Sequence, residues 1–318
     1  MSFTIIRPRD RQEWLSQREG GIGSSEVGTI LGLNPYQTPY QLWRRKLGID
    51  PPTTENFAMR AGHYLEDAVS LFYADETGKE IIKRSKGDWL IVNNDKPYLR
   101  VSPDRTFWLP NLPKNDRNKG ILECKTTQLD IDKDNIPQHW FCQLQYQLGV
   151  AELEQGALAW LVHGRSFDYM DFNFDADFYK WMVEEVDRFW VDNILGKREP
   201  EAVNADDVLL RNPRHVVGKV AEADEETLNA CAELKELKEQ IAALDARKKV
   251  LEGTIKMAIS DAEALVAPSG SGEPTVLATW KVAKDSVKFD EKRFAIEKPE
   301  IYKSYLFTQA GTRRFLIK

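Results

Sequence analysis

The stretch Gly120-Ile121-Leu122-Glu123-Cys124-Lys125-Thr126 alternates apolar and charged side chains, and this pattern predicts a β-strand. Successive side chains of a strand point to opposite faces of the sheet. Glu123 and Lys125 therefore share one face, and we expect Leu122 and Cys124 to point into the core. Two charged residues on one strand face, flanked by apolar neighbours, indicate a functional site rather than a solvated edge.

An earlier strand-like stretch, 99–109, contains the tripeptide Ser102-Pro103-Asp104. The run 110–119 that follows it is polar, and we expect a surface hairpin loop there. A hairpin that joins the two strands would bring Asp104 beside Glu123. The two carboxylates and the lysine of the later strand would then converge.

An aspartate, a glutamate and a lysine that converge in this way suit the hydrolysis of a phosphodiester. Carboxylates bind hard divalent ions, which can supply a nucleophile, stabilise the developing charge and assist the leaving oxygen. The lysine can orient or deprotonate the attacking water and lend positive charge to the transition state. Asp104, Glu123 and Lys125 are therefore candidate catalytic residues of a metal-dependent nuclease. Taken alone, the pattern is also compatible with a surface salt bridge.

The surrounding sequence predicts a mixed α/β domain over residues 1–200. Apolar residues recur every three or four positions between Phe57 and Phe72, which predicts an amphipathic helix. Thr38 precedes a proline and lies three residues before Gln41, a capping-box pattern that predicts a helix start. Further helices are expected at 10–17, at 24–31, from Pro137 and at 176–195, and further strands at 80–92, 156–162 and 168–174.

The sequence after this domain predicts three smaller parts. Residues 201–221 are rich in Pro, Asn and charge and are expected to form a linker. Residues 222–264 carry apolar side chains in steps of three and four, which predicts a long helix or a helical hairpin. The seam consists of Leu234, Leu237, Ile241, Leu244, Lys248, Leu251, Ile255 and Ala258. Residues 265–318 are expected to form a small basic α+β module with a flexible break at 268–274.

The bulk composition narrows the class of protein. The net charge of −6 is uneven, because residues 281–318 hold ten Lys and Arg against five Asp and Glu. A nuclease tolerates a net acidic sequence when metal ions cover its carboxylates and basic patches meet phosphates. The three cysteines form no CxxC pair, which argues against a zinc or iron–sulfur cluster. The sequence shows no secretory signal and no apolar run of about 18 residues, so we expect a cytoplasmic protein without a membrane span.

Five motifs in one order resemble those of the YqaJ-type viral recombinase family, which includes the lambda-type alkaline exonucleases. They are Arg18–Glu26 (REGGIGSSE) continuing to Ile30–Tyr36 (ILGLNPY), Gly62–Glu66 (GHYLE), Ser102–Asp104 (SPD), Glu123–Thr127 (ECKTT) and Gln143–Leu148 (QLQYQL). The resemblance spans about residues 18 to 160 and implies a restriction-endonuclease-like PD-(D/E)XK core. Arg105 departs from the family pattern, which usually has glycine after the SPD motif.

The resemblance implies roles for individual residues. Metal ions would be held by the side chains of Asp104, Glu123 and Glu66 and by the main-chain carbonyl of Cys124. Gln143 would help to position the nucleophile or Lys125. Arg18 and Ser25 would grip a terminal 5′-phosphate, since an arginine fork and a hydroxyl at a helix start both favour phosphate. Arg105 would tighten a phosphate contact or alter the turn.

Ordinary structural roles stay open for several of these residues. Glu66, Gln143, Arg18 and Ser25 are also compatible with boundary, surface or capping positions. The four histidines show no metal-ligand spacing and are interpreted as structural, and three aromatics as core residues: Trp140, Tyr146 and Trp160. The terminal Arg313 and Arg314, with neighbouring lysines, could contact DNA, form a solvated face or dock a partner protein.

The leading hypothesis is a Mg²⁺-dependent exonuclease that acts 5′ to 3′ on double-stranded DNA ends. It would use one or two ions per site, accept Mn²⁺ as a substitute, and leave 3′ single-stranded overhangs for phage or prophage recombination in a bacterial host cell. The resemblance implies a single-strand annealing protein as partner and a homo-oligomer such as a trimeric ring. The alternatives are a structure-specific or flap endonuclease with the same core, and a non-catalytic DNA-binding recruitment protein.

Overall fold

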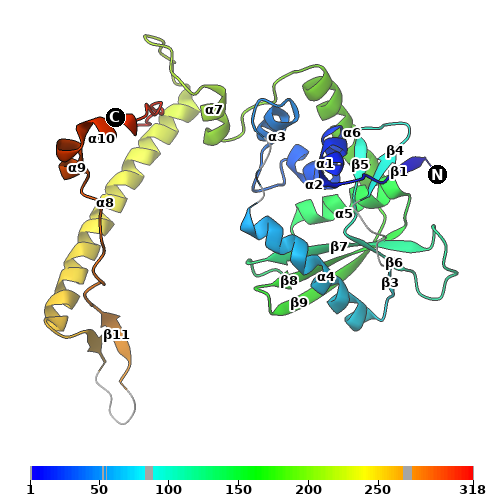
Figure 1. Ribbon diagram of the computed structural model, residues 1–318, viewed down its shortest axis with the longest axis horizontal. Helices are drawn as coiled ribbons and strands as arrows, with labels where there is room; N and C mark the ends of the chain where they lie inside the picture. Colours follow the sequence, from blue (N-terminus) through cyan, green and yellow to red (C-terminus); the bar gives the residue numbers. More distant parts are fainter. Residues whose placement is uncertain (1, 52–53, 55, 83–88, 268–273, 318) are drawn as a thin grey trace. The chain divides into compact units, whose positions relative to one another are not determined.

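The computed structural model describes residues 2–51, 54, 56–82, 89–267 and 274–317. The chain divides into two compact units, Met1–Arg211 and Asn212–Lys318 (Figure 1). The first unit contains the elements of the predicted α/β domain, and its mixed α/β fold class is confirmed. Its helices are α1 (Arg11–Glu19), α2 (Ser24–Ile30), α3 (Pro39–Lys46), α4 (Phe57–Thr77), α5 (Gln138–Ala151), α6 (Ala176–Arg188), the π-helix η1 (Phe189–Leu195) and α7 (Ala205–Arg211).

Within the described residues, a five-stranded mixed sheet forms the centre of the first unit (Figure 1). Its strand order is β3-β6-β7-β8-β9, with bounds Ile81–Ile82, Arg105–Trp108, Lys119–Thr127, Gln155–Val162 and Ser166–Asn173. β7 and β8 run parallel, and the other neighbouring pairs of this sheet are antiparallel. A parallel pair needs a crossover connection, and α5 supplies it. The hairpin predicted between β6 and β7 is present, with residues 109–118 as its loop, and Lys119 of the predicted loop is the first residue of β7.

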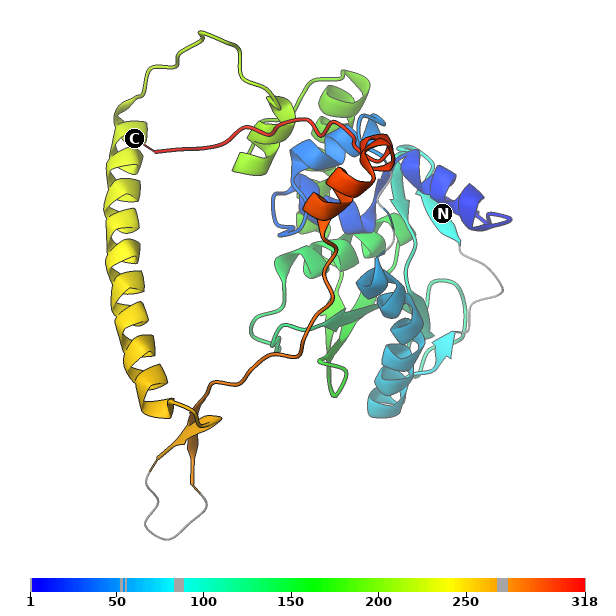
Figure 2. The same ribbon diagram turned by 60° about the vertical axis from the view of Figure 1, so that its left-hand side comes forward.

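Two helices cover the two faces of this sheet (Figure 2). α4 packs against Leu122 and Cys124 of β7 in one apolar cluster. α5 packs on the opposite face, in a second apolar cluster that includes Ile121. Alternation along β7 therefore points Leu122 and Cys124 toward α4, as the sequence predicts. It points Glu123 and Lys125 toward α5, where they meet polar side chains.

A second sheet shows that two sequence predictions need correction. Its order is β1-β4-β5-β2, with bounds Phe3–Ile6, Leu90–Asn93, Leu99–Val101 and Ile22–Gly23. The stretches 80–92 and 99–109 are predicted as single strands, and both predictions are wrong. Each divides into two short strands that belong to different sheets, β3 with β4 and β5 with β6; residues 83–88 lie outside the described part. The second break contains Pro103, which has no N–H to donate to a continuous ladder.

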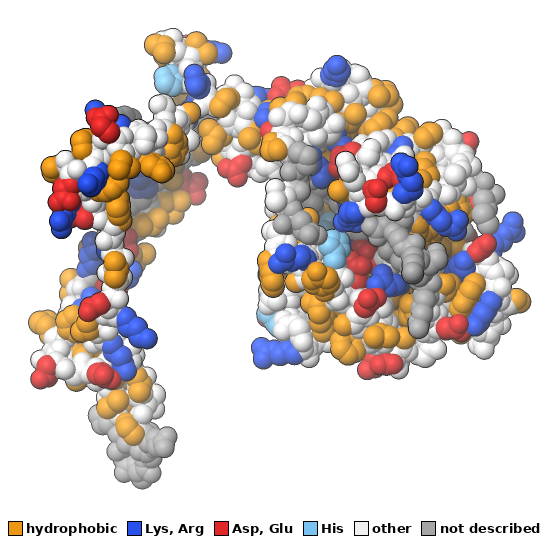
Figure 3. All heavy atoms as spheres, viewed as in Figure 1, with side chains coloured by type: hydrophobic (Ala, Val, Ile, Leu, Met, Phe, Trp, Pro, Cys, Tyr) orange, Lys and Arg blue, Asp and Glu red, His pale blue; other side chains and the backbone are white. Residues whose placement is uncertain are grey.

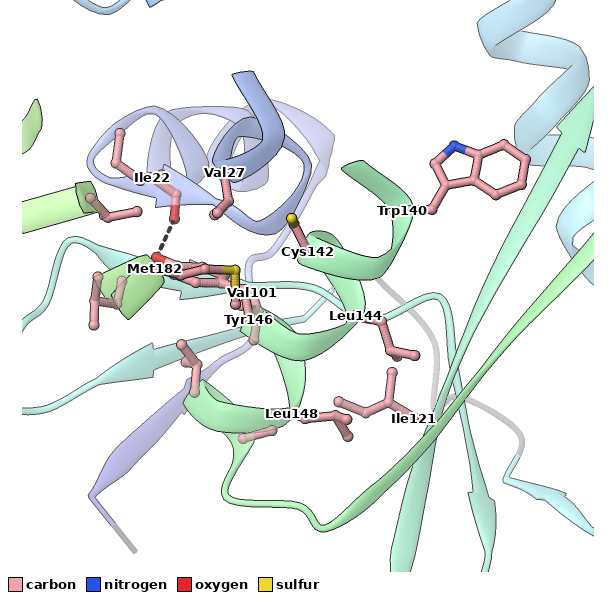
Figure 4. Close-up of a cluster of buried hydrophobic side chains, with 14 of the residues drawn as sticks. Ile22, Val27, Val101, Ile121, Trp140, Cys142, Leu144, Tyr146, Leu148 and Met182 are labelled. Carbon is pink, nitrogen blue, oxygen red and sulfur yellow. Dashed lines mark hydrogen bonds between the residues drawn. The ribbon is translucent and has the colours of Figure 1, made fainter. Parts of the chain in front are cut away.

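The largest apolar cluster joins α2, α5 and both sheets (Figure 4). Tyr146 of α5 is fully buried, and its hydroxyl donates a hydrogen bond to the main-chain carbonyl of Ile22 (3.2 Å). Trp140 and Trp160 are buried in the same cluster. The interpretation of these three aromatics as core residues is confirmed.

The start of α3 follows the predicted capping box. The Thr38 hydroxyl accepts a hydrogen bond from the main-chain N–H of Gln41 (3.1 Å), and the Gln41 side chain accepts one from the N–H of Thr38 (3.2 Å). α4, in contrast, buries a different row of side chains from the predicted one. Phe57 and Phe72 are 76% and 43% exposed, whereas Val69 is fully buried because its row faces the sheet.

The segment 201–221, expected to be a linker, contains α7. Asp207 of α7 is buried, and its carboxylate accepts hydrogen bonds from the Thr38 hydroxyl (2.8 Å) and from the main-chain N–H of Val203 (3.1 Å). These bonds attach α7 to the start of α3. The first unit therefore extends to Arg211 rather than to residue 200.

The second unit consists of one long helix and small elements. α8 (Glu225–Ile259) is a single helix of 35 residues rather than a hairpin. It is followed by the antiparallel strand pair β10 (Ala264–Val266) and β11 (Val276–Thr279), and then by α9 (Glu291–Glu297) and α10 (Pro299–Ser304). Many apolar side chains of this unit are exposed (Figure 3). The predicted break at 268–274 lies, except for its last residue, outside the described residues. No helix in the described ranges is both long enough and apolar enough to span a membrane.

The contact between α2 and α5 generates a stability prediction. A Cβ on Gly28 would lie 2.6 Å from the Cβ of His139, well inside van der Waals contact. Gly28→Ala is expected to lower the free energy of unfolding by about 1–3 kcal/mol, because two packed helices must move apart. Urea unfolding followed by tryptophan fluorescence measures this change.

Gly62→Ala on α4 is the matched control. The atom nearest to its added Cβ would be Thr126 Oγ1 at 3.8 Å, an ordinary contact. Alanine in a helix interior is favoured over glycine by about 0.5–1 kcal/mol, so this variant should be as stable as wild type or slightly more stable. Equal losses in the two variants would contradict the steric account of Gly28.

Candidate active site

Asp104 lies across from Glu123 at the edge where β6 begins. β6 pairs with β7 in the register Arg105 to Leu122, so the residue before β6 falls opposite Glu123. The Asp104 carboxylate accepts a hydrogen bond at Oδ2 from the main-chain N–H of Cys124 (2.9 Å). This bond fixes Asp104 against the strand that carries the other two candidate residues.

Lys125 and Gln143 form a hydrogen-bonded cluster with Glu123. Lys125 Nζ lies 2.7 Å from Glu123 Oε1 and donates to Gln143 Oε1 (2.9 Å). The Gln143 amide nitrogen donates to Glu123 Oε1. One side chain of α5 therefore holds the carboxylate and the ammonium group of β7 at the same time.

Gln147, one turn further along α5, holds the other oxygen of Glu123. Its amide nitrogen donates to Glu123 Oε2 (2.8 Å) and to the Ser24 hydroxyl (3.2 Å). Gln147 and Glu123 are both buried, and Glu123 is only 2% exposed. The sequence analysis did not single out Gln147. Its spacing of four residues from Gln143, on the same helix face, is the signal that could have found it.

Burial and like charges shape the electrostatics of the cluster. Burial raises the pKa of Asp104 well above its usual value, and the carboxylates of Glu123 and Glu66 raise it further. For Lys125, burial lowers the pKa, but Glu123 and Asp104 outweigh this effect and the pKa is raised. Lys125 is therefore a charged hydrogen-bond donor in this cluster. Burial also raises the pKa of the Cys124 thiol, so that side chain stays neutral.

Glu66 brings a third carboxylate near Asp104 from α4. His63 Nδ1 lies 3.1 Å from Glu66 Oε1, and Arg105 Nη1 lies 3.6 Å from Glu66 Oε2. Arg105 also pairs with Asp67 and donates to the main-chain carbonyl of Asp104. The Arg105 guanidinium thus joins α4 to the turn before β6, which suits the altered-turn role. A contact between Arg105 and DNA stays a prediction.

A pocket of about 200 Å³ combines the two groups of predicted site residues. His63, Glu66, Asp104 and Gln143 line one part of it, and Arg11, Trp14, Arg18, Ser24 and Ser25 line another. Arg18 Nη2 donates to the Ser25 hydroxyl (2.6 Å), and the Arg18 guanidinium lies 5.1 Å from the centroid of the Trp14 ring. Acidic and basic side chains also gather on the face of the first unit drawn in Figure 3. The structure therefore brings Arg18 and Ser25 to the same cavity as the carboxylates of Glu66 and Asp104.

The glycine-rich segment before α2 allows the backbone to approach the neighbouring strand β5 of the second sheet closely. The main-chain N–H of Ile22 donates to the carbonyl of Tyr98 (2.6 Å). A Cβ on Gly21 would lie 2.5 Å from the same carbonyl oxygen, so only glycine fits there without a shift. This approach pairs β2 with β5 and sets the position from which α2 starts.

Glu26 of α2 is a buried carboxylate that has its own cations. It is 4% exposed, accepts a hydrogen bond from the main-chain N–H of Gly23 (2.8 Å), and pairs with Arg45 and with Lys46 (3.0 Å). Burial raises its pKa, but Lys46, Arg45 and Arg18 outweigh this effect and the pKa is lowered. Glu26 therefore stays ionised and holds α2 to α3.

The donor set near Asp104 fits a hard divalent cation. Mg²⁺ is usually held by one or two carboxylates and keeps several waters. Burial, followed by the carboxylates of Glu123 and Glu66, raises the pKa of Asp104; Lys125 does not fully offset these effects, and a bound cation would favour the ionised carboxylate. In the described part of the chain, no three His, Cys, Asp or Glu side chains stand close enough to form a ready metal centre. Ions would therefore rest mainly on Asp104 and Glu123, with Glu66 and the carbonyl of Cys124 as further donors.

Two further predictions concern the four histidines and the two arginines near the C-terminal end of the described chain. His63 lines the pocket beside Glu66, and the interpretation of all four histidines as structural stays a prediction. His63 lies three residues before Glu66, so both side chains share one face of α4. Arg313 and Arg314 belong to the second unit, where Arg313 donates to the main-chain carbonyl of Asn212 (3.1 Å). Their contact with DNA stays a prediction.

Known proteins similar to this chain place it in a family. Residues 13–154 match the family described as YqaJ-like viral recombinase domain. The chain is 30% identical, over 97% of its length and 94% of the relative, to the uncharacterised protein YqaJ of Bacillus subtilis (strain 168). The chain belongs to the YqaJ-like viral recombinase family. The resemblance inferred from the five motifs is thereby confirmed.

Other similarities of this YqaJ-like protein are more distant. It is 24% identical to the uncharacterised protein R354 of Acanthamoeba polyphaga mimivirus, over 45% of this chain and 27% of that protein. Among solved structures, an alkaline exonuclease from Laribacter hongkongensis matches with a TM-score of 0.45 and 17% identity, covering 58% of this chain and 93% of the other. A phage-related exonuclease from Haemophilus somnus 129PT matches with a TM-score of 0.37 and 11% identity, covering 56% of this chain and 96% of the other.

The ion pairs of Glu26 generate a stability prediction for this YqaJ-like protein. Glu26→Gln is expected to lower the free energy of unfolding by about 3 kcal/mol, because the buried Lys46 would keep only the half-exposed Glu19 (3.4 Å) as a counterion. A carboxylate with a lowered folded-state pKa stabilises the fold above its ordinary pKa, here 4.5, and loses this effect as the pH falls through the folded-state value. The advantage of wild type over the variant should therefore shrink in acid.

Urea unfolding at a series of pH values from neutral to acid measures this difference. Glu184→Gln on α6 is the control, because Glu184 is exposed and its loss should change little. A difference between wild type and Glu26→Gln that stays constant across the acid range would contradict the ionised state of Glu26.

Proposed function

We propose that this protein is a divalent-metal-dependent DNA exonuclease that hydrolyses phosphodiesters from double-stranded DNA ends. The observation that carries the proposal is the convergence of Asp104, Glu123 and Lys125, of which Asp104 lines one pocket together with Arg18 and Ser25. Membership of the YqaJ-like viral recombinase family supports a reaction on DNA in recombination. The substrate class and the reaction type follow from the chemistry of the two halves of the pocket.

The carboxylate half of the pocket supports metal-assisted hydrolysis. Mg²⁺ bound to Asp104 and Glu123 would supply a polarised water and neutralise charge on the phosphate, and Mn²⁺ could replace it. Lys125 is held by Glu123 and Gln143 and carries a positive charge, so it orients the attacking water and offsets the charge that develops on the phosphate. Gln143 acts by positioning Lys125. Glu66 would hold a second ion or its water.

The cationic half of the pocket supports recognition of a DNA end. The Arg18 guanidinium is fixed on the Ser25 hydroxyl and lies over the Trp14 ring, so its charge is positioned before any ligand arrives. A terminal 5′-phosphate bound there would direct the first phosphodiester toward Asp104 across the same cavity. This arrangement favours digestion from the 5′ end, which leaves 3′ single-stranded overhangs. Such overhangs are the substrate of a single-strand annealing protein, the partner that we propose.

The competing functions fit the pocket less well. A non-catalytic DNA-binding protein would have no use for the carboxylates of Glu66, Asp104 and Glu123, which repel phosphate. A structure-specific or flap endonuclease would use the same carboxylates and the same lysine. The phosphate anchor at Arg18 favours the exonuclease, because an enzyme that cuts within a strand needs no terminal phosphate.

Linear duplex DNA, end-labelled on each strand in turn, is expected to be digested from its 5′ ends in the presence of Mg²⁺ and to stay intact without it. A covalently closed circular duplex should also stay intact, because it offers no end. Linearisation of the circle would identify an endonuclease instead. Failure to cut either substrate with Mg²⁺ or Mn²⁺ would overturn the proposal.

Three volume-conserving variants test the named residues within this experiment. Asp104→Asn, Glu123→Gln and Lys125→Met are each expected to slow digestion by about a thousandfold, since each removes a charge that the transition state needs. Lys133→Ala is the control, because Lys133 is half-exposed and pairs with Asp168 (3.0 Å) away from the pocket residues. A rate within about tenfold of wild type for any of the three variants would count against the site.

Arg18→Ala is expected to slow digestion of 5′-phosphorylated ends by about 10- to 100-fold, the worth of a charge-assisted hydrogen bond. Digestion of 5′-hydroxyl ends should change much less, because they lack the group that Arg18 would bind. The measurement is the initial rate on two duplexes that differ only in this phosphate. Arg9→Ala, which removes an exposed arginine outside the pocket lining, is the control. Equal losses on the two duplexes would speak against the anchor role.

A further inference from the structure

α8 displays an apolar seam that the other described elements of the second unit leave open to solvent. Its residues step three and four positions along one helix face: Leu234, Leu237, Ile241, Leu244, Lys248, Leu251, Ile255 and Ala258. In the middle of the seam, Ile241, Leu244 and Leu251 are 58%, 67% and 54% exposed. Of the 35 residues of α8, Ile259 alone is buried. A long helix with leucines in solvent along one stripe has the form of one half of a helix–helix interface.

The seam follows the composition rule for two-stranded coils. With heptad positions written a to g, Leu234 occupies an a position and Leu237 a d position. Isoleucine fills two of the four a positions, at Ile241 and Ile255, and leucine fills three of the four d positions. β-branched residues at a with leucine at d favour two parallel helices over three or four. Lys248 fills the remaining a position, and a single polar residue at a fixes register at a cost in stability.

We propose that α8 pairs with the α8 of a second copy of this chain in a parallel, in-register coiled coil. Each seam residue would pack against the same residue of the partner, and the two Lys248 side chains would lie in one layer. Because the helices run in the same direction, the two Met1–Arg211 units would both attach at the N-terminal end of the coil, through residues 212–224.

The charges that flank the seam support the parallel register. In such a coil, a residue at g faces the partner's residue at e five positions later, and these pairs set orientation and partner choice. Glu233 at g then faces the partner's Lys238 at e. Arg247 at g faces the partner's Glu252 at e. Twofold symmetry repeats both pairs, so the parallel coil gains four attractive contacts.

The same residues oppose an antiparallel pair. When two helices of opposite direction are aligned on the middle of the seam, e faces e and g faces g. Asp245 at e would then face the partner's Asp245, and Arg247 at g would face the partner's Arg247. Both contacts are repulsive. Lys238 with the partner's Glu252 occurs twice by symmetry, so the antiparallel pair has two attractive and two repulsive contacts. The parallel coil has four attractive contacts against one Lys248 layer, so charge complementarity selects the parallel arrangement.

The first test measures the mass of the full chain by analytical ultracentrifugation at micromolar concentration. The double variant Leu237→Asp, Leu244→Asp is expected to have half the mass of wild type, because it places four carboxylates in the seam of each pair. Val250→Asp is the matched control, since Val250 is 69% exposed on α8 but lies outside the seam, and it should keep the wild-type mass. The near-ultraviolet spectrum checks that the first unit, which holds eight of the nine tryptophans, is folded in each variant.

The second test exchanges charges across the interface. Arg247→Glu and Glu252→Arg should each weaken self-association by about tenfold, because each turns two attractive pairs into repulsive ones. An equal mixture of the two variants should recover the wild-type affinity, since both pairs become attractive again in the mixed dimer. An antiparallel coil would instead leave Arg247→Glu as tight as wild type, because one like-charge pair replaces another.

Four outcomes would overturn the proposal. They are a monomeric wild-type chain, an unchanged mass of the Leu237→Asp, Leu244→Asp variant, an equal loss in Val250→Asp, and a mixture of charge variants that associates no better than either variant alone. The readout is mass and affinity, so the result is independent of whether the protein digests DNA.

Discussion

The architecture of the first unit depends on how Asp104 reaches β7. The chain leaves the four-stranded sheet after β5, turns at Pro103, and enters the five-stranded sheet at β6. At that crossing the Asp104 carboxylate accepts the N–H of Cys124 (2.9 Å) instead of continuing a strand ladder. The short segment between β5 and β6 therefore directs the carboxylate of Asp104 toward the backbone of β7. In an unbroken strand, the same residue would hydrogen-bond through its main chain only. The pocket lies beside this crossing and is lined by residues of α1, α2, α4 and α5.

Helix α5 gives the site its rigidity. Most of this helix is apolar core, yet it carries Gln143 and Gln147 toward β7 at successive turns. Amides that are taken out of water are costly unless they are hydrogen-bonded. Here both amide nitrogens donate to Glu123, and Gln143 Oε1 accepts from Lys125, whereas Gln147 Oε1 has no hydrogen-bond partner in the described part of the chain. The packing that holds α5 against the sheet therefore also fixes the catalytic candidates. A shift of α5 would break the core and the site together.

The sequence predicted those parts of the site whose pattern is local. Alternation along 120–126 was sufficient to place Glu123 and Lys125 on one face, and the polar loop was sufficient to place Asp104 opposite. The features that the sequence did not predict depend on contacts between distant segments of the chain. The strand-like stretches 80–92 and 99–109 look continuous because periodicity within a strand carries no information about which sheet the strand joins. The place of His63 in the pocket lining likewise depends on the approach of α4 to β6.

Two carboxylates of the same unit, the buried Glu26 and the partly buried Asp104, differ in the charges around them. Glu26 has Lys46, Arg45 and Arg18 around it, and its pKa falls despite burial. At Asp104, burial raises the pKa, the neighbouring carboxylates of Glu123 and Glu66 raise it further, and Lys125 does not outweigh them. A fold that needed only to hold its elements together would supply cations at both places, as it does at Glu26. At Asp104 the chain instead gathers carboxylates beside a pocket, a charge arrangement that becomes favourable when a cation from solution joins it.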